Sequence, residues 1–179
     1  DSNDRVRGAF LNAQFEFPRG RITINLAPAD LPKEGCSFDL AIAVGILAAS
    51  QQIKTKELLD YEFVGELALS GELRPVRAVL PMCVSAQASR RSLVLPEANA
   101  REAALVKNLS LLPAANLLAV SQHFNQLQAL PAYTADYPEV ESAPSLDLAD
   151  IRGQQHAKRA LEIAAAGGHH LLFMGPPGT

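Results

Sequence analysis

Hydrophobic residues recur along the chain with two different periods, and these predict two kinds of element. Apolar residues three or four positions apart, after possible N-cap side chains, predict a helix over residues 4–14. Strict alternation predicts a half-buried strand over 21–26, with every second residue apolar. Residues 38–49 are apolar on nearly every side, which is typical of a helix at the centre of a core.

The pattern that follows predicts a hairpin and then alternating helices and strands. The hairpin has strands over 62–69 and 72–76 and turns at Ser70-Gly71. The later elements are helices over 78–89, 97–107 and 116–127 and strands over 92–95 and 109–112. This alternation indicates an α/β (α+β) domain covering residues 1–130.

After residue 130 the pattern changes twice. Residues 131–149 contain three prolines and several acids without periodicity, and we expect an extended linker. A helix is then predicted over 154–166, ended by two glycines, and a short apolar strand over 171–174. Residues 150–179 are therefore predicted to begin a second domain, and the chain to be a piece of a longer protein.

Charge and composition narrow the class of protein. Five acids and no base fall within 131–150, whereas residues 1–130 are balanced with 13 of each sign, so no global basic bias marks an autonomous nucleic-acid binder. The longest apolar run, Leu40–Ala49, is too short for a bilayer, which needs about 18 residues. Cys36 and Cys83 lack metal-ligand spacing and suit a reducing compartment. We expect a cytoplasmic protein without a membrane segment.

The strongest chemical signal lies at the end of the chain. An apolar strand runs into Gly175, Pro176, Pro177, Gly178 and Thr179, which supply the first five positions of the phosphate loop G-x-x-x-x-G-K-[S/T]. Glycines let successive backbone N–H groups turn toward phosphate oxygens. The lysine and the hydroxyl for Mg²⁺ would follow Thr179. Alone, these five residues also fit an ordinary turn after a strand.

The residues before this loop favour the phosphate-binding interpretation. A D-I-x-G-Q segment, an Ala-rich helix, Gly-Gly, an apolar strand and GPPGT together resemble the opening of an AAA+ ATPase module. The resemblance implies that Ile151, Arg152 and Gly153 lie near adenine and residues 175–179 near the phosphates. ATP and Mg²⁺ are then the cofactors of the parent chain, and residues 1–179 alone are expected to be inactive as an ATPase.

A second resemblance concerns a serine. The stretches PADLPKEGCSFDLAIAVGILAAS (28–50) and GELALSGELRPV (65–76) resemble the proteolytic domain of the Lon family. The resemblance places Ser37 at the nucleophile position and Leu80 where the family has its catalytic lysine. A serine hydroxyl needs an adjacent base, and no lysine occurs between Lys56 and Lys107. We therefore predict no catalytic residue, no peptidase activity, and Ser37 as a helix N-cap.

All these blocks together resemble the magnesium-chelatase-like AAA+ proteins of the bacterial ComM (YifB) type. This implies a Lon-like domain with the ribosomal protein S5 domain 2-like fold, joined to an ATPase that forms homohexamers. It also implies ATP-driven branch migration of DNA during competence. No chelation is predicted, because the sequence shows no porphyrin or metal site. Two alternatives are a protein-interaction adaptor of an ATPase and, less favoured, a Ser–Lys peptidase.

Candidate contacts to DNA are eight of the nine arginines in the first 130 residues, with solvated surface charges as the alternative. Lys158 and Arg159 are expected to be helix-surface charges. The four histidines (His123, His156, His169 and His170) lack partners at ligand spacing, so no metal site is predicted. The candidate arginines are Arg5, Arg7, Arg19, Arg21, Arg74, Arg77, Arg90 and Arg91.

Overall fold

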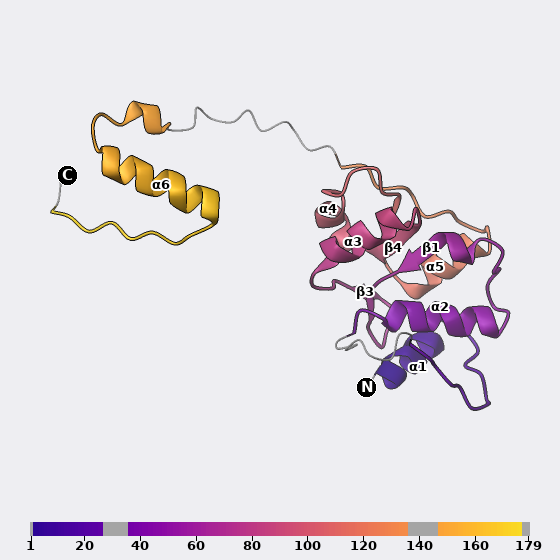
Figure 1. The fold of residues 1–179 in the computed structure, drawn as a ribbon. Helices are drawn as coiled ribbons and strands as arrows, with labels where there is room; N and C mark the ends of the chain where they lie inside the picture. Colours follow the sequence, from indigo (N-terminus) through magenta and orange to yellow (C-terminus); the bar gives the residue numbers. More distant parts are fainter. Residues whose placement is uncertain (1, 27–35, 136–146, 177–179) are drawn as a thin grey trace. The chain divides into compact units, whose positions relative to one another are not determined.

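A computed structural model describes residues 2–26, 36–135 and 147–176 of the chain. The chain divides into two compact units, unit 1 over residues 1–136 and unit 2 over residues 137–179 (Figure 1). None of the described helices is both long enough and apolar enough to cross a membrane.

Unit 1 is built on a parallel sheet of three strands. These are β1 (Tyr61–Phe63), β4 (Ser92–Pro96) and β5 (Leu111–Ala114), in the order β1-β4-β5. Phe63 lies opposite Val94 in the register of the first pair. Because helices cover both faces of the sheet, β4 and β5 are buried along nearly their whole length.

The side chains of β4 divide between two layers of helices. Val94 joins a large cluster with the helices on one face, whereas Leu93 and Leu95 join a smaller cluster on the other. This alternation is the period of two expected of a strand, and the mixed α/β class predicted from the sequence is confirmed. The first layer holds α1 (Ser2–Asn12), α2 (Asp39–Ala49) and α5 (Leu117–Phe124); the second holds α3 (Val79–Ala88) and α4 (Ala100–Ala103).

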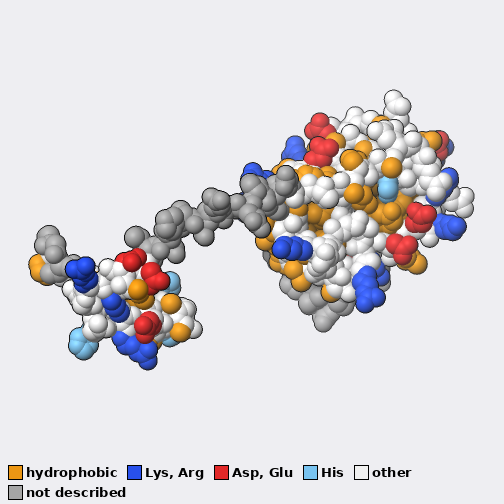
Figure 2. Space-filling view, turned by 90° about the horizontal axis from the view of Figure 1, so that it is seen from above, with side chains coloured by type: hydrophobic (Ala, Val, Ile, Leu, Met, Phe, Trp, Pro, Cys, Tyr) orange, Lys and Arg blue, Asp and Glu red, His pale blue; other side chains and the backbone are white. Residues whose placement is uncertain are grey.

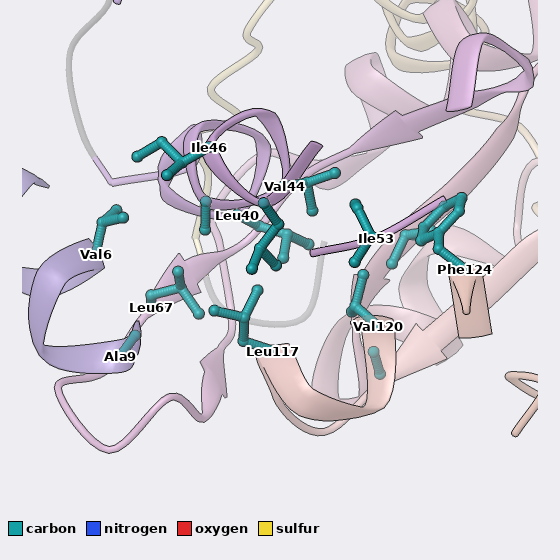
Figure 3. Packing of buried hydrophobic residues seen from close by; sticks show 14 of the residues in the cluster. Val6, Ala9, Leu40, Val44, Ile46, Ile53, Leu67, Leu117, Val120 and Phe124 are labelled. Carbon is teal, nitrogen blue, oxygen red and sulfur yellow. The ribbon is translucent and has the colours of Figure 1, made fainter. Parts of the chain in front are cut away.

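The all-apolar helix lies at the centre of the larger cluster, as predicted. Leu40 and Val44 of α2 point toward Leu117 and Val120 of α5, in the view of Figure 3. On its opposite flank the helix contacts α1, whose Val6 is buried. A helix covered on several sides in this way needs apolar residues around its whole circumference.

The predicted turn at Ser70-Gly71 is present, but the strand before it differs from the prediction. The hairpin pairs only β2 (Glu66–Leu67) with β3 (Leu73–Arg74), whereas β1 pairs with β4 in the other sheet. The chain changes sheet at Val64 and Gly65, because the first donates its N–H to Val94 and the second to Ser37. Continuous apolar character cannot reveal such a change of partner.

The prediction of a strand over residues 21–26 is wrong. The segment carries no strand pairing, and Ile24 is 45 % exposed. It borders a groove of about 580 Å³ against Ile42 and Ile46 of α2. Alternation predicts which side of a segment is apolar, but a strand also needs a neighbouring backbone, and the described residues provide none.

The remaining bounds shift by a few residues. The helix predicted over 97–107 is shorter, since a 3₁₀ turn, η2 (Glu97–Asn99), precedes the four residues of α4. The strand predicted over 109–112 begins two residues later, as β5. Asn99, the last residue of η2, is tied to the chain at Val76. Its buried side-chain amide accepts from the Val76 N–H and donates to the Val76 carbonyl, both at 2.9 Å.

The described part of unit 2 contains a 3₁₀ turn, η3 (Leu148–Asp150), and one long helix, α6 (Gln155–Gly167). A reciprocal capping box between Asp147 and Asp150 closes the turn. After α6 the chain runs back beside the helix (Figure 1). The strand predicted over 171–174 is not formed, because no described strand lies beside it to complete a ladder.

Candidate functional site

The entry to α6 is shaped by two residues in the left-handed region. Gly153 has φ +71° and Gln154 has φ +50°. Glycine adopts this conformation without strain, whereas Gln154 has a Cβ and adopts it less readily. The two residues turn the chain sharply between Ile151 and the first turn of the helix.

This turn helps to form a pocket within unit 2. The pocket has a volume of about 470 Å³ and is lined by Ile151 before the helix and by Gly175 after it. The two ends of the predicted nucleotide-binding segment therefore face the same space. The other lining residues come from one face of α6 and from the returning chain, namely Gln154, Ala157, Lys158, Leu161, Phe173 and Met174.

Not all of the predicted nucleotide contacts line this pocket. Arg152, Gly153 and Pro176 are described but do not border it. Pro177, Gly178 and Thr179 lie outside the described residues. Conversely, Lys158, which was predicted to be a helix-surface charge, lines the pocket, and so does Gln154, for which no contact was predicted. Gln154 and Lys158 are four residues apart, so they lie on the same helix face as Leu161. This spacing could have identified them from the sequence.

Ser37 lies half-buried in the turn before α2, and the predicted N-cap role is wrong. The N-cap residue is Phe38, and no side chain caps the helix. Backbone groups take this role instead, because the Leu40 N–H donates to the Gly65 carbonyl at 3.0 Å. The Gly65 N–H in turn donates to the Ser37 carbonyl at 2.9 Å. Leu80, at the position of the family's lysine, lies on α3.

The acid next to this turn forms a contact that the sequence analysis missed. Asp39 is fully buried in the first turn of α2, where its carboxylate accepts from Arg5 Nε at 2.7 Å and Arg5 Nη2 at 3.2 Å. The Leu67 N–H also donates to it, at 3.4 Å. This hydrogen bonding and the opposite charge raise the pKa of Arg5. Arg5 thereby links α1 to α2.

This ion pair gives one of the arginines predicted to contact DNA a structural role. Arg5 donates two hydrogen bonds and an opposite charge to a buried carboxylate, and loss of such a partner destabilises a fold. Arg91 lies 3.7 Å from Glu62, and the Arg7 guanidinium lies 5.8 Å from the centroid of Phe17. The remaining candidates, all exposed, are Arg19, Arg21, Arg74, Arg77 and Arg90. In Figure 2 the basic side chains of the visible face are interspersed with acidic ones.

Two further titratable groups are perturbed by burial. His123 Nδ1 accepts from the Leu130 N–H at 3.1 Å, and burial lowers the pKa of this histidine. Burial raises the pKa of the Cys83 thiol to about 11, so its reactive thiolate form is scarce at neutral pH. Among the described residues, no three His, Cys, Asp or Glu side chains gather closely enough to hold a metal ion.

Two family models match the chain. Residues 1–99 match the family described as subunit ChlI of Mg-chelatase. Residues 147–179 match the family described as magnesium chelatase, subunit ChlI. The first match covers more than half of the chain, and the second contains both the α6 pocket and the predicted phosphate loop.

Curated relatives resemble the whole chain. It is 54% identical to the competence protein ComM of Haemophilus influenzae over 183 residues, 100% of this chain and 36% of that protein. It is 46% identical to YifB of Escherichia coli and 45% identical to YifB of Salmonella typhimurium, again along 100% of this chain and 35% of each relative. The chain thus spans about a third of the length of these relatives.

Proposed function

The chain belongs to the ChlI-like family of Mg-chelatase, and from this premise we propose that it forms part of an ATP-driven DNA-remodelling motor. In this proposal unit 1 is a Lon-like accessory domain with the ribosomal protein S5 domain 2-like fold. Unit 2 begins an AAA+ module that assembles as a homohexamer and serves competence, as the name of the Haemophilus relative suggests. We propose DNA as the substrate of this motor.

The observation that carries the proposal is the pocket beside α6, which is lined by both Ile151 and Gly175. Its volume of about 470 Å³ lies in the range of small-ligand sites. Its lining combines apolar side chains, which suit the faces of a purine, with the polar groups of Gln154 and Lys158. The chemistry fits adenine on the apolar side and phosphates toward Gly175.

Each part of the proposed nucleotide site has its own task. Ile151 packs against the base, while Arg152 and Gly153 shape the segment that passes it. Backbone N–H groups of Gly175, Gly178 and Thr179 hold phosphate oxygens, since Pro176 and Pro177 have no N–H to donate, and Mg²⁺ would be bound by groups that follow Thr179 in the loop pattern. When bound, ATP supplies the free energy of its hydrolysis to the motor.

Nucleotide binding by the full-length parent protein tests the pocket. Ile151→Asp places a charge on the apolar side of the pocket, and we expect at least a tenfold loss of affinity for a fluorescent ATP analogue. The matched control is Ile163→Asp, an exposed isoleucine that does not line the pocket. Equal affinities for the two variants would contradict the assignment of the pocket.

ATP hydrolysis by the full-length parent, with and without branched DNA, tests the motor. We expect branched DNA to stimulate hydrolysis. Hydrolysis indifferent to DNA would contradict the DNA motor and favour the adaptor hypothesis. Ser37-dependent labelling by a serine-reactive probe would instead contradict the prediction that unit 1 lacks peptidase activity.

A further inference from the structure

A groove on unit 1 combines positive charge with aromatic rings. It has a volume of about 890 Å³ and lies between α1, the loop after it, and the end of α2. Arg7 and Arg19 both line it and are exposed, and Glu16 is the one acid among its lining residues. We call it the Arg7–Arg19 groove. Its charge favours an anionic ligand.

The loop that forms one wall is held in place by its own contacts. Gln52, after α2, bonds both backbone groups of Glu16: the Glu16 N–H donates to Gln52 Oε1 at 3.0 Å, and Gln52 Nε2 donates to the Glu16 carbonyl at 2.8 Å. Phe15 and Phe17 pack edge-on against the buried ring of Phe10, with centroids 5.9 and 5.4 Å apart. The groove therefore keeps its shape without a ligand.

The geometry of Arg7 gives the groove a second property. Its guanidinium lies over the ring of Phe17, 5.8 Å from the centroid. Aromatic rings and the flat faces of arginines are the platforms on which proteins stack unpaired nucleic-acid bases. A paired base within a duplex does not offer its face, so this arrangement suits a single strand.

From these observations we propose that the Arg7–Arg19 groove binds single-stranded nucleic acid. Arg7 and Arg19 neutralise backbone phosphates, and a base stacks on the Arg7–Phe17 pair. The proposal rests on the proposed function, because it names the surface by which a DNA-remodelling motor holds an unpaired strand. It also selects two of the eight arginines predicted from the sequence.

The test is the affinity of the full-length parent for a fluorescent oligothymidylate of about 16 nucleotides, measured by anisotropy between about 50 and 200 mM salt. The variant is Arg7→Ala/Arg19→Ala. The control is Lys56→Ala/Lys107→Ala, which removes two exposed lysines that neither line the groove nor belong to the predicted DNA contacts. Circular dichroism checks that every variant is folded.

We expect the groove variant to lose at least about tenfold in affinity and the control to bind like wild type. Two lost phosphate contacts should also flatten the slope of log affinity against log salt by about 1.4. Phe17→Leu keeps an apolar side chain but removes the ring, and should weaken binding at least about fivefold without changing the salt slope.

Equal losses in the groove and control variants would overturn the proposal, since they would indicate diffuse attraction. Competition by polyglutamate as strong as that by oligothymidylate would overturn it in favour of an acidic peptide. If the groove variant binds normally while DNA still stimulates hydrolysis, the groove is wrong and the proposed motor stands. If the wild-type protein neither binds oligothymidylate nor shows DNA-stimulated ATP hydrolysis, the proposals of the groove and of the motor are both wrong.

Discussion

Helices α2 and α6 are similar in length, yet they lie in opposite environments. Six of the eleven residues of α2 are buried, including its only charged one, Asp39. Of the thirteen residues of α6, only Ala164 is buried. The chain after α6 is also exposed, with Met174 at 89 %. A parallel sheet with helices on both faces closes the core of unit 1, whereas the described part of unit 2 has no second layer.

Apolar residues therefore contribute differently to the stability of the two units. In unit 1 apolar residues contribute to stability through burial, whereas the apolar residues Leu171–Met174 of unit 2 are exposed and contribute little in this way. The same kind of substitution should therefore have unlike effects in the two units. The following predictions test this contrast, beginning with the largest effect.

Hydrogen exchange should show the largest contrast. Amides of α2 should exchange only on global unfolding, because the helix is enclosed by α1, α5 and the sheet. Amides of α6 should exchange by local opening, on the order of a thousandfold faster. Mass spectrometry of peptides from the two helices measures both rates. Equal protection would show that α6 is stabilised as strongly as the core.

Truncation of a core leucine should give the next largest effect. Leu47→Ala in α2 removes a fully buried side chain and should lower the free energy of unfolding by about 3–4 kcal/mol. Ile163→Ala in α6, where the side chain is 52 % exposed, should change it by less than about 0.5 kcal/mol. Urea denaturation measures both. A large loss for Ile163→Ala would contradict the contrast.

One ion pair from each unit should differ in the same way. Arg5→Met removes two hydrogen bonds and a positive charge from buried Asp39 and should cost about 3 kcal/mol. Arg159→Met breaks an exposed pair with Glu162 and should cost less than about 0.5 kcal/mol. Urea denaturation again decides. In the double variant Arg5→Met/Asp39→Leu the buried carboxylate is removed as well, and most of the stability should return. No recovery would mean that Arg5 stabilises the fold through packing alone.

The smallest effect should come from pH. Burial lowers the pKa of His123 in the folded state, so the unfolded chain binds the proton more readily. Stability is therefore complete above the ordinary pKa of about 6.5 and falls as the pH drops toward the folded value. A protonated Nδ1 also cannot accept from Leu130. Urea midpoints between neutral and acidic pH should fall less in His123→Gln than in wild type, whereas the control His156→Gln should follow wild type.

Local sequence signals were sufficient for much of unit 1. The apolar character of α2, the turn at Ser70-Gly71 and the helix beginning near Asn116 all depend on neighbouring residues. Pairing between strands that are distant in the sequence could not be predicted from such local signals. The parallel pairing of β1 with β4 joins segments about thirty residues apart and was missed, and the segment 21–26 showed a strand pattern without a partner strand.

The candidate site was predictable to a similar degree. The loop pattern and the segment before α6 pointed to Ile151 and Gly175, which line one pocket. Lys158 was missed because its position on that helix face matters only once the chain folds back. The pair of Arg5 with Asp39 was missed because the two residues are 34 positions apart and their charges alone do not reveal the burial of the acid.

The path by which the chain leaves unit 1 has a mechanical consequence. β5 is an edge strand, and the Tyr133 N–H donates to the Leu111 carbonyl on it at 2.9 Å. A few residues earlier, Leu130 is held by His123. Tension on the chain beyond Tyr133 would therefore act first at the edge of the sheet, on these hydrogen bonds and on the packing of Tyr133 and Leu130 against the two clusters. Because these contacts lie outside the central strand, we expect them to break one after another before the core unfolds.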